Sequence, residues 1–217
     1  MIDPAVARAN MVENQLRPNR IDDAGVLRAM GEVPRERFVP DALRGCAYGD
    51  EDLALGGGRY LIEPLALAKL LQTAAPTAGD VALVVGDITG YATAVLARLA
   101  GSVFCLLPQD EAPGPVEARL AETGASNIAL AQGVPDAGLP AQAPFDLILL
   151  VGSVATIPPA LVEQLGAEGR LVGVVEHGRS GRVTLVRKIH GALGRVTPFD
   201  AQIHRLPGLA RQPAFSF

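Results

Sequence analysis

A glycine loop between an apolar strand and a helix is the strongest candidate for chemistry in the sequence. The apolar run Val81–Val85 stops at Gly86, and Gly90 then opens a helical pattern with an apolar face. A strand, a glycine turn and a helix form the first unit of α/β folds that bind nucleotide cofactors, because the glycines let the ligand approach the backbone. The candidate cofactor-binding residues of this loop are Gly86, Asp87, Gly90 and Tyr91.

Two loop residues restrict what this loop can bind. Ile88 stands where such loops usually carry a second glycine, and its β-branched side chain fills space that a glycine leaves open. Asp87 places an acid among the loop amides, where it would repel a phosphate. S-adenosylmethionine has no phosphate and carries positive charge, so the loop suits it better than a phosphate-bearing dinucleotide.

The composition indicates one globular domain and excludes several classes of partner. The chain has 217 residues, of which 49% are hydrophobic, and a formal net charge of −4. This length suits one α/β domain with a small N-terminal addition. No nucleic-acid partner is expected, because Lys and Arg are not clustered and aromatic residues make up only 4%. The two cysteines lack the spacing of metal ligands, so no metal is expected.

The sequence predicts a cytoplasmic protein without a membrane partner. The N-terminus lacks the basic start and long apolar core of a signal peptide. No apolar run reaches the length of about 18 residues that a membrane span needs.

The sequence of the N-terminal third predicts helices joined by loops. Asp3 followed by Pro4 predicts a capped helix at the start, and Asp22 or Asp23 predicts the cap of a second. Residues 50–59 combine three acids with three glycines and predict a mobile acidic loop. The helices are expected at residues 3–15, 22–30 and 64–72, with a proline-bracketed connector at 33–40.

From Val81 onward, apolar strands alternate with helices, which predicts a parallel sheet covered on both faces. The expected strands are Val81–Val85 and residues 103–107, 127–131, 145–151 and 169–175, and the expected helices are residues 91–100, 115–123 and 158–165. Residues 181–189 and 194–201 alternate apolar and polar side chains and predict an antiparallel pair. Methyltransferase folds add such a reversed strand, whereas dehydrogenase folds generally do not.

Three segments resemble one known family, in order and over nearly the full length. The first is VPRERFVP at residues 33–40, and the second is Ala47-Tyr48, Asp50 and LALGGG at residues 53–58. The third and most specific is IPPAL at residues 157–161, Gln164-Leu165, and GRLV at residues 169–172. With these segments the sequence resembles the protein-L-isoaspartate O-methyltransferase family.

The resemblance implies a fold, a reaction and a cofactor. It implies a Rossmann-like S-adenosylmethionine methyltransferase fold, with a mostly parallel central sheet, antiparallel C-terminal strands and an N-terminal helical extension. Residues 1–60 would form a helical cap and substrate loop, and residues 61–217 the α/β domain, within one structural unit. Family members transfer a methyl group from S-adenosylmethionine to isoaspartyl carboxylates of protein or peptide substrates.

At five family positions this sequence has an apolar residue where the family has an acid, a glycine or a hydroxyl. These degenerate positions are Ile62, Val84, Ile88, Leu107 and Val134. The acid that the family has at position 107 binds both ribose hydroxyls, and each charged hydrogen bond contributes about 1.5–3 kcal/mol. Losing it costs on the order of 3 kcal/mol, which is about a hundredfold in affinity. The five losses together predict that ordinary cofactor binding is weakened or absent.

Other acids could compensate, and other residues could line the cleft. Asp87, Asp110 and Asp136 lie near the replaced positions, and each could also be a solvated or locally bonded side chain. The candidate cleft residues are Arg59, Tyr60, Glu63 and Pro64, and an Arg59–Glu63 pair could be structural.

Two functions therefore remain open from the sequence. The first is a protein-L-isoaspartate O-methyltransferase, in which the substrate carboxylate is its own nucleophile and alignment supplies most of the catalysis. The second is a catalytically inactive relative that serves as a binding or regulatory module for an unknown protein partner. The replaced residues favour the second.

Overall fold

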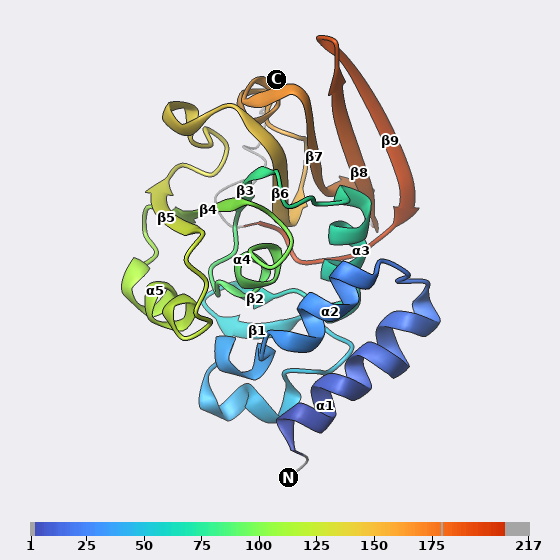
Figure 1. Ribbon diagram of the computed structural model, residues 1–217, viewed down its shortest axis with the longest axis vertical. Helices are drawn as coiled ribbons and strands as arrows, with labels where there is room; N and C mark the ends of the chain where they lie inside the picture. Colours follow the sequence, from blue (N-terminus) through green and yellow to red (C-terminus); the bar gives the residue numbers. More distant parts are fainter. Residues whose placement is uncertain (1–2, 179, 207–217) are drawn as a thin grey trace, which may run out of the picture.

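A seven-stranded sheet forms the centre of the molecule (Figure 1). The structure is a computed structural model, and it describes residues 3–178 and 180–206. The strand order is β5-β4-β3-β6-β7-β8-β9; the first five strands are parallel, and β8 and β9 are antiparallel to their neighbours. These directions and the N-terminal helices confirm the predicted Rossmann-like methyltransferase fold.

Every strand and helix predicted from Val81 onward is present, and all but β3 have shifted ends. The strands are Val81–Val85 (β3), Ser102–Pro108 (β4), Ile128–Gly133 (β5), Phe145–Val154 (β6), Leu165–His177 (β7), Ser180–Ile189 (β8) and Ala192–Asp200 (β9). The helices are Tyr91–Leu96 (α4), Pro113–Ala121 (α5) and Pro159–Glu163 (α6). Helix α6 ends before the predicted residue 165 because Leu165 already pairs with Phe145 in the sheet.

The N-terminal helices begin as their caps predict. Helix α1 is Pro4–Asn10 and continues through a π-helical segment, Met11–Leu16, while α2 is Ala24–Glu32 and α3 is Pro64–Ala74. Asp3 accepts a hydrogen bond from the Ala5 amide at 2.8 Å, and Asp23 accepts one from the Val26 amide at 2.9 Å. Four 3-10 helices complete the helical elements of the described residues: Arg17–Asn19, Arg35–Phe38, Asp41–Cys46 and Pro140–Gln142.

The prediction of an acidic loop at residues 50–59 is wrong for the part that forms strands. Strands Leu53–Gly56 (β1) and Arg59–Leu61 (β2) pair as an antiparallel hairpin. The three glycines at its tip all have positive φ, a conformation that glycine adopts without strain. The predicted division after residue 60 falls inside β2, and it stays a prediction.

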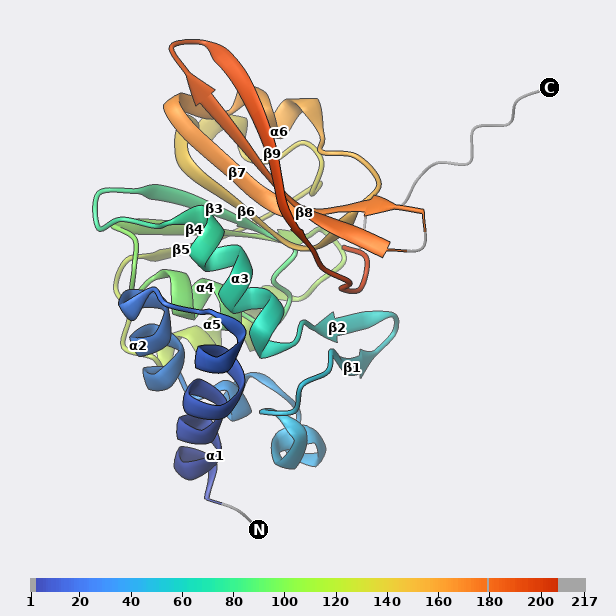
Figure 2. The same ribbon diagram turned by 90° about the vertical axis from the view of Figure 1, so that its right-hand side faces the viewer.

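The helices are distributed unequally over the two faces of the sheet. Helices α3, α4 and α5 cover one face together with α1 and α2, whereas α6 lies on the other face (Figure 2). Along β3, Ala82 and Val84 pack in the core of the first face, and Leu83 and Val85 pack in the core of the second. Burial on both faces explains why the sequence of β3 is continuously apolar.

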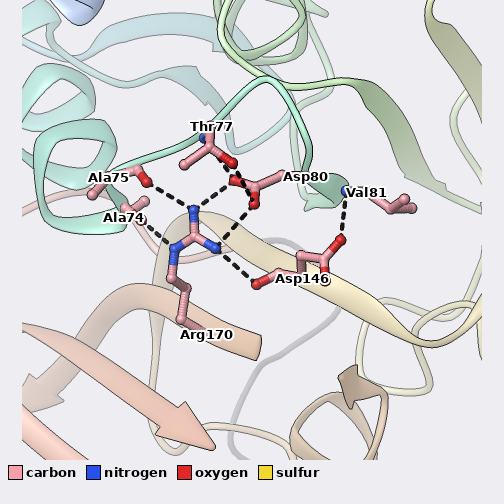
Figure 3. Close-up of polar contacts among 7 residues, drawn as sticks. All are labelled: Ala74, Ala75, Thr77, Asp80, Val81, Asp146 and Arg170. Atoms are coloured by element: carbon pink, nitrogen blue, oxygen red, sulfur yellow. Dashed lines mark hydrogen bonds and ion pairs between the residues drawn. The ribbon is translucent and has the colours of Figure 1, made fainter. Parts of the chain in front are cut away.

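An arginine network fixes the amino-terminal end of the parallel strands (Figure 3). Arg170 of β7 donates to the Asp80 carboxylate at 2.6 Å and 3.3 Å, to the Asp146 carbonyl at 3.1 Å, and to the carbonyls that end α3. Asp146 in turn accepts from the Val81 amide at 2.9 Å. The network thereby joins β3, β6, β7 and the end of α3, on the side of the sheet away from the glycine loop.

Successive strands are added on one side of β3 and then on the other, and this switch indicates where a ligand site should lie. From β3 the chain proceeds outward to β4 and β5 on one side and then crosses to β6 on the other. Ligands of open α/β sheets bind in the crevice outside the carboxyl ends of the strands at such a switch point. In this chain that crevice lies between Gly86, which follows β3, and Gly152, near the end of β6.

None of the described helices is long and apolar enough to span a membrane.

Candidate functional site

The acid of the glycine loop serves as a helix cap. Asp87 is buried, with 2% of its surface exposed. One carboxylate oxygen accepts from the Gly90 amide and the Thr89 hydroxyl, both at 2.9 Å. The other accepts from the amide and the hydroxyl of Thr93, at 2.8 and 2.9 Å. Four donors from the loop and the first turn of α4 therefore occupy the carboxylate, which stabilises the loop and the start of the helix.

Gly90 and Tyr91 also support the fold. Gly90 has a φ of +87°, and a Cβ there would lie 3.1–3.2 Å from Val116 and Leu120 of α5. Tyr91 is fully buried, edge-on to Phe38 at 5.5 Å between ring centroids, and the Arg35 guanidinium lies 4.9 Å from its ring centre. Burial raises the pKa of Tyr91 to about 12. This predicted cofactor residue faces the N-terminal segments instead.

Arg35 contacts three separate segments of the chain next to the glycine loop. It is fully buried and donates to the Ala47 and Ile62 carbonyls, both at 2.6 Å, while it packs on Tyr91. Burial lowers the pKa of Arg35. Within residues 3–178 and 180–206, neither its Nη1 atom nor the Tyr91 hydroxyl makes a hydrogen bond of good geometry, although the charge of Arg35 acts on Tyr91 and opposes the rise in its pKa.

The unpartnered hydroxyl leads to a stability prediction. Tyr91→Phe should leave the free energy of unfolding unchanged or raise it by about 1 kcal/mol, because the buried hydroxyl gains no hydrogen bond to offset its desolvation. Tyr48→Phe is the matched control: its hydroxyl bonds to Glu36 and Arg8, so removing it should destabilise by about 1–2 kcal/mol. Urea unfolding of both variants tests this, and a large loss at Tyr91 would contradict it.

The five degenerate positions fall in four environments. Val84 and Leu107 are fully buried in the core, Ile62 is 2% exposed beside Arg35, and Val134 is 47% exposed just after β5. Ile88 is 8% exposed and borders a cavity of about 370 Å³. No polar side chain stands at any of the five, so none offers a hydrogen bond to a ligand.

The cavity beside Ile88 also brings Asp110 and Arg59 together. It lies between the glycine loop, the segment after β4, α5 and the hairpin β1–β2. Arg59 pairs there with Glu111 at 2.9 Å, an ion pair that raises the pKa of the arginine. The expected Arg59–Glu63 pair is therefore wrong. Of the three compensating acids, Asp110 lines this cavity, whereas Asp136 is exposed elsewhere.

An acid-rich hollow of about 660 Å³ lies on the other side of the hairpin. Five carboxylates line it, together with two basic residues near the C-terminus: Asp50, Glu51, Asp52, Glu63 and Glu176, with His204 and Arg205. Burial, and then the neighbouring acids Asp52 and Asp50, raise the pKa of Glu63. Tyr60 stacks on His204, with ring centroids 3.4 Å apart, and Pro64 is buried as the first residue of α3. The four candidate cleft residues therefore do not line one cleft. Arg59 lines the cavity beside Ile88, and Glu63 lines the acid-rich hollow.

A segment that the sequence did not single out lies in the crevice at the switch point. Residues 202–206 run beside the end of β6, and we call them the C-terminal strap. The Ser153 amide donates to the His204 carbonyl and the Leu206 amide donates to the Ser153 carbonyl, both at 2.9 Å. Leu206 is 1% exposed. The only hint in the sequence is a pair of isolated apolar residues, Ile203 and Leu206, in a polar stretch.

Comparisons with known proteins agree with this fold. The family model described as protein-L-isoaspartate(D-aspartate) O-methyltransferase matches residues 7–198. A protein-L-isoaspartate O-methyltransferase of Methylorubrum extorquens is 45% identical over 185 residues, which cover 85% of this chain and 80% of that one. Another, of Koribacter versatilis, is 37% identical over 204 residues, covering 94% and 92%. The chain belongs to the protein-L-isoaspartate O-methyltransferase family.

A solved structure of this family shows the same fold. A putative protein-L-isoaspartate O-methyltransferase from Plasmodium falciparum, in complex with S-adenosyl-L-homocysteine, matches with a TM-score of 0.80 and 20% identity. The match covers 93% of this chain and 98% of the other. The resemblance inferred from the three sequence segments is therefore confirmed, as is the fold that it implied.

Three positions where the family resemblance implies cofactor contacts have other contacts in this chain. The acid of the loop is a helix cap, the ribose position is the buried Leu107, and Leu206 lies against the first glycine. The described residues also contain no group of three or more His, Cys, Asp or Glu side chains arranged for a metal.

Proposed function

We propose that this chain is a non-catalytic member of the protein-L-isoaspartate O-methyltransferase family that serves as a binding or regulatory module. The observation that carries the proposal is the complete use of Asp87 by four internal donors. Asp87 was the acid nearest the first glycine that could have replaced the missing ribose ligand. With Leu107 buried and Asp87 occupied, neither of these two positions offers a carboxylate to the ribose hydroxyls.

The acid-rich hollow supports the same proposal from the substrate side. Glu63 follows Ile62 at the family's substrate loop, and Asp50 and Glu51 line the same hollow, in which Asp52 and Glu176 are already paired with His204 and Arg205. An isoaspartyl group is itself a carboxylate, so these acids would repel it, and close like charges are costly where solvent screening is reduced. Protein or peptide binding without methyl transfer is the function that this arrangement favours.

One observation favours the family's methyl transfer as a second candidate. Asp110 lines the cavity beside Ile88, next to the carboxyl end of β4, where a carboxylate for the ribose would be needed. The curated relatives at 37–45% identity are named for that reaction. Activity would require Asp110 to bind the ribose and the strap to leave the crevice.

Titration with S-adenosyl-L-homocysteine separates the two candidates. We expect no calorimetric binding and no rise in melting temperature, and no methylation of an isoaspartyl peptide. A ligand at about 100 times its dissociation constant would add about 2.7 kcal/mol, which is a rise of about 5–10 °C for a chain of this size. Micromolar binding would overturn the non-catalytic proposal, and its loss in Asp110→Ala would then assign the ribose contact. The cytoplasmic location stays a prediction.

A further inference from the structure

The strap lies at the switch point between β3 and β6, where open α/β sheets bind their ligands. Gly86 has a φ of +88°, and a Cβ on it would lie 2.5 Å from Leu206 Cγ and 2.6 Å from Leu206 Cδ1. On the opposite wall, a Cβ on Gly152 would lie 2.8 Å from both Cα and Cβ of Leu206. Leu206 therefore fills the crevice between β3 and β6, in contact with the backbone of both walls.

Backbone and side-chain contacts hold the strap in this place. Arg205 pairs with Ser153 as an isolated parallel bridge, so the strap lies alongside the end of β6. The Arg205 guanidinium donates to Glu176 of β7 at 2.5 and 2.6 Å. The His204 amide and ring both contact the Asp52 carboxylate, at 3.0 and 2.7 Å, and the ring stacks on Tyr60. The strap is thus attached to β6, to β7 and to the hairpin.

We propose that the C-terminal strap is an intramolecular occupant of the switch-point crevice, and that Leu206 must leave before any ligand can contact Gly86. The apolar side chain takes the volume beside the glycine, and the basic side chains bind the acids that border it. The strap thereby closes the crevice independently of the substitutions at positions 88 and 107.

Because those substitutions also oppose cofactor binding, the test starts from a variant that removes one of them. Ile88→Gly restores the central loop glycine, and S-adenosyl-L-homocysteine is the probe. We expect Ile88→Gly/Leu206→Ala to bind the probe at least ten times more tightly than Ile88→Gly alone. Ile88→Gly/Ile203→Ala is the matched control, because Ile203 is a buried aliphatic residue of the same strap that packs in the other core. It should bind as Ile88→Gly does.

The proposal would be overturned if Ile88→Gly and Ile88→Gly/Leu206→Ala bound the probe with equal affinity. It would also be overturned if neither variant bound the probe detectably. Binding of the probe by the unmodified chain would instead overturn the non-catalytic function, so the two failures are distinguishable.

A second measurement does not depend on the probe. Arg205→Ala removes the pair with Glu176 and leaves the core of the protein intact, so it should speed hydrogen exchange at the Ser153 and Leu206 amides relative to β3. Unchanged exchange at both amides would show that the strap is not held in the way described.

Discussion

Arg170→Met should lower the free energy of unfolding by about 3–5 kcal/mol, because it leaves the Asp80 carboxylate buried without its countercharge. The side chains of Arg170 and Asp80 are only 12% and 8% exposed. The variant also removes donors from the Asp146 carbonyl and from the carbonyls of Ala74 and Ala75 (Figure 3). Urea unfolding at neutral pH measures the loss.

Two companion variants separate charge from geometry in this network. Arg170→Lys keeps the positive charge but loses the planar fork that reaches Asp80 and three carbonyls, so it should retain only part of the stability. Adding Asp80→Asn to Arg170→Met should recover some of the loss, because no buried charge then remains unpaired. A double variant that is no more stable than Arg170→Met would show that the ion pair is not the source of the effect.

The same pair gives a direction for the pH dependence. Burial favours the neutral form of Asp80, but the hydrogen bonds from Arg170 and Thr77 and the charge of Arg170 outweigh it, so its pKa is lowered. A carboxyl with a lowered folded-state pKa contributes stability that is present above its unfolded pKa and lost as pH falls through the folded pKa. The difference in free energy of unfolding between the unmodified chain and Arg170→Met should therefore be largest at neutral pH and shrink as pH falls through the folded-state pKa of Asp80, which urea unfolding at a series of pH values measures.

Asp87→Asn should destabilise the chain by about 2–4 kcal/mol, because the amide group cannot accept from donors on both sides. In the asparagine, an NH2 group replaces one of the two carboxylate oxygens. This NH2 group would face either the donors of Thr93 or those of Gly90 and Thr89. Asp110→Asn is the matched control, since Asp110 is an exposed acid in the next loop, and it should change stability by less than about 0.5 kcal/mol.

Thermal unfolding followed by circular dichroism measures both variants. If Asp87→Asn proved as stable as the unmodified chain, the carboxylate would be free for another role, and the main support for the non-catalytic function would be lost.

The sequence predicted the sheet almost completely, because its signals are local. Continuous apolar runs bounded by glycine and proline indicate strands buried on both faces, and β3 matches its predicted range residue for residue. The antiparallel C-terminal pair was predicted from alternation, although its turn is the two residues His190 and Gly191, both with positive φ, rather than residues 190–193.

The candidate site was predicted less well, because it depends on contacts between distant segments. The partner of Arg59 is Glu111, 52 residues away, and spacing along the chain pointed instead to Glu63. The sequence places Asp87 in the loop but does not say whether its side chain turns toward a ligand or toward the first turn of α4. Leu206 meets Gly86 only because the strap pairs with the end of β6, and no local pattern in the sequence encodes that contact.

The fit of Leu206 between two glycines bears on how such a loop tolerates mutation. A Cβ at Gly152 would collide with the backbone of Leu206, and one at Gly86 with its side chain, so packing against the leucine favours glycine at both positions. Packing can therefore account for these glycines without a ligand, and their presence alone does not indicate a bound cofactor. In this chain, the residue that occupies the crevice says more about access of a ligand than the glycines that line it do.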